Sequence, residues 1–154
     1  MAAPYYEAGY QVIAPDLRAC GESEGDYVGM GWLDREDILR WIDFILADDP
    51  QAKIVIHGIS MGAATTMMTA GESTPDNVKL RGGLRLHQCV GYFSSELQLR
   101  FGLPEFPILY TASGVARLRA GYSFTEASAL AQVARCEKPM LLSTARRTTS
   151  SLTR

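Results

Sequence analysis

Residues 53–64 read KIVIHGISMGAA, and this stretch limits the possible folds more than any other. Its β-branched residues predict a strand that ends near residue 57, and the small residues after Ser60 predict a helix that begins at once. Only a very sharp turn over Gly58–Gly62 can join the two elements. A strand that runs directly into a helix is typical of a parallel sheet whose strands are connected by helices. The sequence therefore predicts an α/β fold, with a mainly parallel sheet flanked by helices.

Ser60 lies at the centre of this turn, in a Gly-x-Ser-x-Gly pattern whose strand–turn–helix context favours a nucleophilic serine. The turn should hold Ser60 in a strained backbone conformation at the carboxyl end of the sheet. We expect glycine at 58 and 62 because side chains there would collide with the packed strand and helix. The backbone N–H of Met61 can donate to a developing oxyanion. The alternatives are a serine in a merely structural turn, or a phosphate-binding loop, which needs more glycine and usually a following lysine.

Three other residues compete with Ser60 for a catalytic role. Ser23 lies in a second match to the pattern, Gly21–Gly25, but no apolar run leads into it and its flanking glutamates would oppose an oxyanion. His57 precedes Ser60 by three residues in the predicted strand, where its ring would reach the hydroxyl poorly. His87 is the only other histidine and lies in an atypical segment. Ser60 and the Met61 N–H are the predicted catalytic groups.

The rest of the chain alternates between strand and helix signals. The clearest helix is Leu33–Ala47, because its isoleucines and Trp41 recur at helical spacing. Ser123 or Thr125 is expected to cap a later helix. The other predicted elements are the end of a helix at 2–8, a strand at 10–14, helices at 61–71, 108–119 and 125–134, and the start of a strand at 138–142.

Composition excludes several classes of protein. The 154 residues are 47% hydrophobic and 21% charged, which is typical of a soluble globular domain. A net charge of −2 predicts no nucleic acid or anionic membrane as partner. We see no signal peptide and no membrane segment, so a cytoplasmic location is the default expectation. The three cysteines are widely spaced and odd in number, and we predict from them no disulfide framework and no metal site.

Several motifs in order resemble one family. Residues 9–23, GYQVIAPDLRACGES, resemble the strand and loop of α/β-hydrolases, although Ala19-Cys20 stands where that family usually has Gly-His. Residues 57–65, HGISMGAAT, resemble the elbow of a bacterial branch labelled serine aminopeptidase-like (S33-type) hydrolases. The resemblance covers roughly residues 4–79 and 93–141. It implies a Ser-His-Asp triad, hydrolysis of an ester, amide or peptide bond, a small-molecule or peptide substrate, and no cofactor or metal.

The resemblance also implies that parts of the fold are missing. Residues 1–142 would form a partial α/β-hydrolase domain, with a possible cap at 93–124, that lacks N-terminal strands and the C-terminal strand and helix. The loop with the second oxyanion donor would precede residue 1, and the histidine would lie beyond residue 154. The triad aspartate should follow the strand near residue 142, where the chain instead has a polar, basic tail at 143–154.

Residues 80–92 and 142–154 depart from the family pattern. Both can be back-translated so that a shifted frame recovers the expected motifs, which suggests a frameshift in the gene. The alternative is a divergent loop and a disordered tail. Two functions therefore stay open: a serine hydrolase with Ser60 as nucleophile, and an inactive truncated or pseudogene product. A third, weaker reading gives Ser60 an improvised base, His57 or His87.

Overall fold

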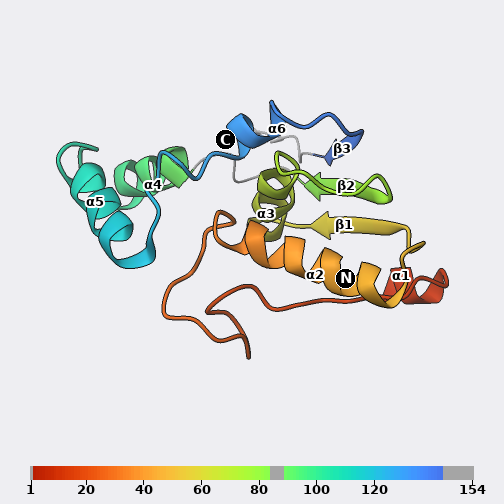
Figure 1. The fold of residues 1–154 in the computed structure, drawn as a ribbon. Coiled ribbons are helices and arrows are strands. Elements are labelled where there is room, and N and C mark those ends of the chain that lie inside the picture. The colour runs from red at the N-terminus through yellow and green to blue at the C-terminus, as the bar shows by residue number, and fades with distance from the viewer. Residues whose placement is uncertain (1, 84–88, 144–154) are drawn as a thin grey trace, which may run out of the picture.

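The computed structural model describes residues 2–83 and 89–143 of the chain, and Figure 1 shows its helices and strands. In chain order the elements are α1 (Ala3–Glu7), α2 (Asp34–Asp48), β1 (Ile54–Gly58), α3 (Met61–Thr69), β2 (Val78–Gly83), α4 (Cys89–Glu96), the π-helix η1 (Leu97–Phe101), α5 (Ile108–Ala120), α6 (Ala129–Val133) and β3 (Met140–Ser143).

The strands form a three-stranded sheet in the order β1-β2-β3, and both pairings are parallel. The register places Ile54 beside Val78 and Gly58 beside Gly82. Parallel neighbours need a crossover connection, which α3 supplies between β1 and β2. The α/β class predicted from the strand–turn–helix stretch is confirmed.

Helices α2 and α3 cover one face of this sheet. Ile42 of α2 is 2% exposed and forms a buried cluster with Ala70 and Val78, against which Ile54 and Ile56 pack. Because side chains alternate along a strand, the side chain of Val55, between Ile54 and Ile56, points to the other face of the sheet. That face is more open to solvent: Val55 is 51% exposed and Leu141 of β3 is 58% exposed.

A second buried cluster joins α3 to the C-terminal half of the chain. Met67 and Met68 of α3 are each 1% exposed and pack with Tyr122, Ala127 and Ala129. The Tyr122 hydroxyl also donates to the carbonyl oxygen of Val28, at 3.2 Å. Helices α4 and α5 form a lobe beside this cluster (Figure 1).

The strand predicted over residues 10–14 is wrong. Helix α1 ends at Glu7, and in the turn after it Gly9 has a φ of +85° and the N–H of Tyr10 donates to the carbonyl oxygen of Tyr5. The chain beyond is extended, but no strand among the described residues pairs with it. A strand needs a neighbour for its N–H and C=O groups, so the β-prone composition alone could not make one.

The helix predicted over residues 125–134 is shorter than expected, and its predicted cap is wrong. Ser128 caps α6, because its Oγ accepts the N–H of Ala131 at 3.3 Å. Ser123 instead forms a separate turn, in which it exchanges hydrogen bonds with Glu126. The reciprocal Ser–Glu contact resembles a capping box, but extended backbone at Ser128 breaks the helix before it can propagate.

The other predicted elements are confirmed to within a few residues: the helix ending near Gly9, α2, β1, α3, α5 and β3. The atypical segment 80–92 contains the end of β2 and the start of α4, and its residues 84–88 lie outside the described residues, as does the tail from residue 144. Within the described residues, no helix is both long and apolar enough to cross a bilayer.

Candidate active site

The turn between β1 and α3 places Ser60 in a rarely populated backbone conformation. Its φ is 55° and its ψ is −116°, in the region that side chains other than glycine avoid. Strand β1 ends at Gly58 and helix α3 begins at Met61, so two residues carry the whole reversal. The predicted strained turn at the carboxyl end of a parallel strand is therefore present, and the side chain of Ser60 is exposed.

Gly58 allows this turn to be so tight. A Cβ atom at Gly58 would lie 2.0 Å from the carbonyl oxygen of Gly62 and 2.6 Å from the N atom of Ala63. Gly62 differs, because a Cβ there would meet nothing within 4 Å apart from the helix's own nearby backbone. The prediction that packing requires glycine at both positions is correct for Gly58 and wrong for Gly62, whose side-chain position points away from β1.

The backbone N–H groups that follow Met61 in α3 are satisfied within the turn. Gly62 N donates to Ile59 O at 3.0 Å, and Ala63 N and Ala64 N donate to Ser60 O at 3.0 and 3.1 Å. Among the described residues, the N–H of Met61 has no hydrogen-bond partner. It lies at the start of a nine-residue helix, where the helix dipole favours negative charge. A donor in this position can stabilise an oxyanion formed beside Ser60 Oγ.

Buried packing holds α3 in place behind the turn. The helix is buried from Ala63 to Thr69, and its threonine hydroxyls donate to carbonyl oxygens one turn earlier. Gly31, with φ +85°, brings the loop before α2 close to α3, since a Cβ at Gly31 would lie 3.0 Å from Thr65 N. Asp34, fully buried, accepts the N–H of Gly31 at 2.7 Å and so fixes that loop. A rigid helix start is what a positioned N–H donor requires.

His57 is engaged by the N-terminal helix. The Tyr5 hydroxyl lies 2.7 Å from His57 Nδ1, and the two rings meet edge to face with centroids 5.6 Å apart. Sequence reasoning could not find this partner, because the two residues are 52 positions apart. His57 lies on the sheet face opposite Ile56 and Gly58. His87, the other histidine considered as a base, lies outside the described residues.

Ser23, the serine of the second Gly-x-Ser-x-Gly match, lies in an irregular loop rather than between a strand and a helix. Its hydroxyl donates to the carbonyl oxygen of Asp16 at 2.8 Å. The loop also contains Ala19 and Gly21 at positive φ, so its geometry is that of a folded surface turn.

No acid or base accompanies Ser60 in the part of the chain that the structure describes: no side chain there hydrogen-bonds to its hydroxyl. The same residues contain no group of three or more His, Cys, Asp or Glu side chains placed to hold a metal ion. Cys20 and Cys136 are free thiols. The described site thus consists of an exposed serine hydroxyl, one helix N-terminus and the turn that presents them.

Comparison with known proteins identifies the fold family. The family model for the alpha/beta hydrolase fold matches residues 1–80, which is just over half of the chain and includes the strand, the turn and α3. The chain belongs to the alpha/beta hydrolase fold family. This alpha/beta hydrolase chain is also 29% identical over 139 residues to the uncharacterized protein YqkD of Bacillus subtilis (strain 168). The match covers 89% of the chain but 46% of that relative, so the chain spans less than half the relative's length. No solved structure matches it significantly.

Proposed function

We propose that this alpha/beta hydrolase chain carries the nucleophile of a serine hydrolase of the serine aminopeptidase-like (S33-type) branch. The bond that it hydrolyses would be an ester, amide or peptide bond in a small-molecule or peptide substrate. The observation that supports this most directly is the backbone of Ser60, with φ 55° and ψ −116° between β1 and α3. Such strain persists only where the surrounding structure enforces it, and it occurs most often at functional sites.

The proposed chemistry is acyl transfer. Ser60 Oγ attacks the substrate carbonyl while a histidine accepts the hydroxyl proton, and the carbonyl oxygen becomes an oxyanion beside the Met61 N–H. The intermediate expels the leaving group, which takes the proton from the histidine, and water then hydrolyses the acyl-enzyme. His57 fits the base poorly, because it lies within β1 three residues before Ser60 and its ring packs against Tyr5 of α1. By the family resemblance, the aspartate and the histidine of this mechanism would follow the nucleophile in the chain.

The alternative is a catalytically inactive product. It is favoured by the lack of any acid or base at Ser60 in residues 2–83 and 89–143. Under this proposal residues 80–92 and 142–154 derive from shifted reading frames, and residues 1–142 form a partial domain. The nucleotide sequence tests the frameshift directly: if no single-base insertion or deletion restores family motifs in both segments, that idea is refuted.

Labelling with a fluorophosphonate probe separates the two functions, because the probe reacts only with an activated serine. If Ser60 is a working nucleophile, wild type is labelled and Ser60→Ala is not. Ser23→Ala is the matched control, since it removes the serine of an identical Gly-x-Ser-x-Gly pattern and should leave labelling unchanged. Labelling of Ser60→Ala would contradict the assignment of the nucleophile. A complete lack of labelling in folded wild type would favour the inactive product.

We also propose that residues 93–124 form a cap that contacts the substrate. Its large apolar side chains are unusually exposed: Leu99 is 82%, Phe101 68% and Phe106 73% exposed. Exposed apolar surface of this kind marks binding grooves as well as interfaces. An apolar acyl or peptidyl group would suit it. Comparing hydrolysis of esters with short and long acyl chains by wild type and Phe101→Ala tests this contact.

A further inference from the structure

The loop before α2 forms a pocket on the outer side of that helix. The pocket has a volume of about 460 Å³, which lies within the range of small-molecule sites. Its lining combines carboxylates, guanidiniums and aromatic rings, contributed by Asp16, Arg18, Ser23, Glu24, Asp37, Arg40, Trp41 and Phe44. Three carboxylates face two guanidiniums, so the lining carries a net negative charge. None of these residues belongs to the turn around Ser60.

The loop holds the carboxylate of Asp16 in one position. Asp16 Oδ2 accepts the N–H of Glu22 at 3.1 Å. The carboxylate also lies against Gly21, where a Cβ would come within 2.1 Å of Oδ2. The hydroxyl of Ser23 donates to the carbonyl oxygen of Asp16 and closes the loop from the other side. A carboxylate fixed in this way loses little conformational freedom when a ligand binds to it.

Both guanidiniums lie near Asp37, Arg18 in close contact and Arg40 more loosely. Arg18 donates from Nε and Nη2 to the two oxygens of Asp37 at 2.9 and 2.8 Å, and this hydrogen bonding raises the pKa of Arg18. Arg40 lies 3.6 Å from the same carboxylate. Asp16 and Glu24, in contrast, form no ion pair with any of the described residues. Asp37 carries one charge and neutralises only one of the two guanidiniums, so together with Asp16 and Glu24 the lining keeps one net negative charge.

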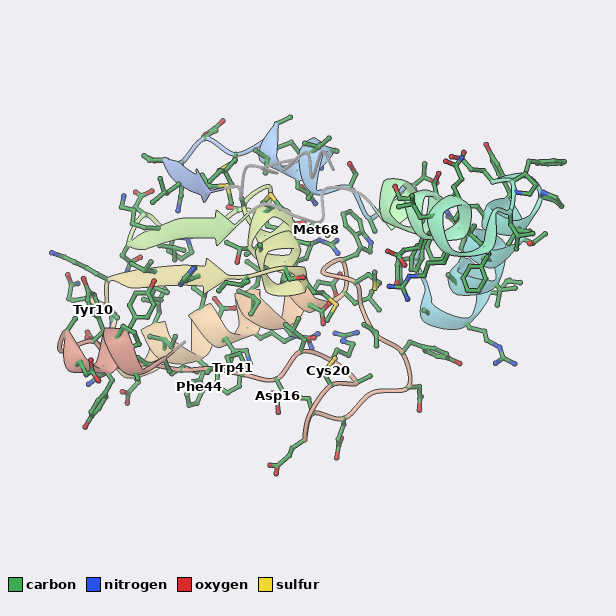
Figure 2. The ribbon with its side chains drawn as sticks, turned by 180° about the vertical axis from the view of Figure 1, so that it is seen from behind. Tyr10, Asp16, Cys20, Trp41, Phe44 and Met68 are labelled. Atoms are coloured by element: carbon green, nitrogen blue, oxygen red, sulfur yellow. The ribbon has the colours of Figure 1, made fainter. Side chains whose placement is uncertain are left out.

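Trp41 and Phe44 supply an apolar wall. Their rings meet edge to face, with centroids 5.7 Å apart and an interplanar angle of 83°. They are 39% and 64% exposed, so neither is buried in the core. Figure 2 shows both side chains, with Asp16 nearby, on the side of α2 where the loop runs. Aromatic faces attract organic cations, and Trp does so most strongly.

We propose that this pocket binds a small organic monocation with a flat apolar body, of the arylalkylammonium class. The ammonium lies between Asp16 and Glu24, and the apolar body lies against Trp41 and Phe44. An anion is disfavoured because the lining carries a net negative charge and the Arg18 guanidinium is held in a two-point contact with Asp37. A bare metal ion is disfavoured by the aromatic wall, which offers it no ligand.

NMR titration of the ¹⁵N-labelled chain with benzylammonium tests the proposal. The chain has two tryptophans, so two indole N–H signals are expected, and Trp41→Phe assigns them. Trp32 is the internal reference, because its ring lies under the Arg35 guanidinium at 3.7 Å and does not line the pocket. Benzylammonium should shift the Trp41 signal saturably and leave that of Trp32 in place. Benzyl alcohol and benzoate should bind at least about tenfold more weakly, since each lacks the positive charge.

Charge variants provide the decisive comparison. Glu24→Gln should weaken binding of benzylammonium about threefold, and the double variant Asp16→Asn/Glu24→Gln about tenfold. Asp76→Asn is the matched control: it removes the same charge from an exposed loop residue outside the pocket and should have little effect. Glu24→Gln keeps the test valid if the double variant misfolds, because Glu24 holds the loop through its backbone carbonyl, which accepts the N–H of Ala19 and is unchanged by the substitution. Equal binding of benzyl alcohol and benzylammonium, or equal effects of Glu24→Gln and Asp76→Asn, would overturn the proposal.

Discussion

Replacing Gly58 with alanine tests the geometry of the turn. The added methyl group would lie 2.0 Å from the carbonyl oxygen of Gly62 and 2.2 Å from its carbonyl carbon. Both are backbone atoms of the first turn of α3, so no side chain can rotate to make room. Overpacking a rigid site costs roughly 1–3 kcal/mol, and backbone contacts this close place the cost at about 3 kcal/mol.

Gly62→Ala is a matched control with the opposite expected sign. It adds the same methyl group four residues away, where the structure shows nothing within 4 Å. Gly62 lies inside α3 at negative φ, so alanine should stabilise the helix by about 0.5–1 kcal/mol. The two substitutions should therefore differ by about 4 kcal/mol.

Urea unfolding followed by far-UV circular dichroism measures both effects as changes in the free energy of unfolding. For a chain of this length, 1 kcal/mol shifts Tm by roughly 2–4 °C. Gly58→Ala should then lower Tm by roughly 6–12 °C, while Gly62→Ala should raise it slightly. If the two variants are equally stable, or if Gly62→Ala is the less stable one, the tight contact between β1 and α3 is not present and the argument fails.

Two further predictions concern the core and the pH dependence of stability. Met68→Ala should lower the free energy of unfolding by about 2–5 kcal/mol, because Met68 is 1% exposed. The control Leu118→Ala removes a side chain that is 88% exposed and should change the free energy of unfolding by less than about 0.5 kcal/mol in the same assay. The Ser123 backbone N–H, with help from Arg117, lowers the pKa of Glu126 below its ordinary 4.5, so the stability from this contact is present above that value and is lost as the pH falls through the lowered pKa. Glu126→Gln should remove this dependence. The variant should therefore be less stable than wild type above pH 4.5, and the difference in the free energy of unfolding, measured by urea unfolding, should shrink as the pH is lowered below 4.5. A difference that does not change with pH would contradict the lowered pKa of Glu126.

Local signals in the sequence predicted those parts of the fold that depend on local interactions. The spacing of Ile38, Ile42 and Ile45 predicted α2 because a helix satisfies its own hydrogen bonds. The β-branched run at 54–56 and the glycines after it predicted β1 and its turn into α3. Gly58 and Ser60 are therefore where the sequence suggested they would be.

Features that depend on distant partners could not be predicted. Residues 10–14 have strand composition, but pairing needs a neighbouring strand, and the chain pairs none with them among the described residues. The contact between Tyr5 and His57 joins residues 52 positions apart, and no pattern in the sequence predicts it. The pocket of Asp16 and Trp41 depends on how a loop folds against α2. The difference between Gly58 and Gly62 likewise depends on which side of the turn faces β1.

The backbone of Ser60 has a consequence for evolution. At φ 55° and ψ −116° glycine would be less strained, and a serine there lowers the stability of the fold by roughly 1–3 kcal/mol. A lineage that no longer needed the hydroxyl would gain stability by drifting to glycine with a single substitution. Serine at this position therefore reports how recently the hydroxyl was needed. Among related sequences that have lost the use of the hydroxyl, the fraction with glycine here should rise with the time since that loss.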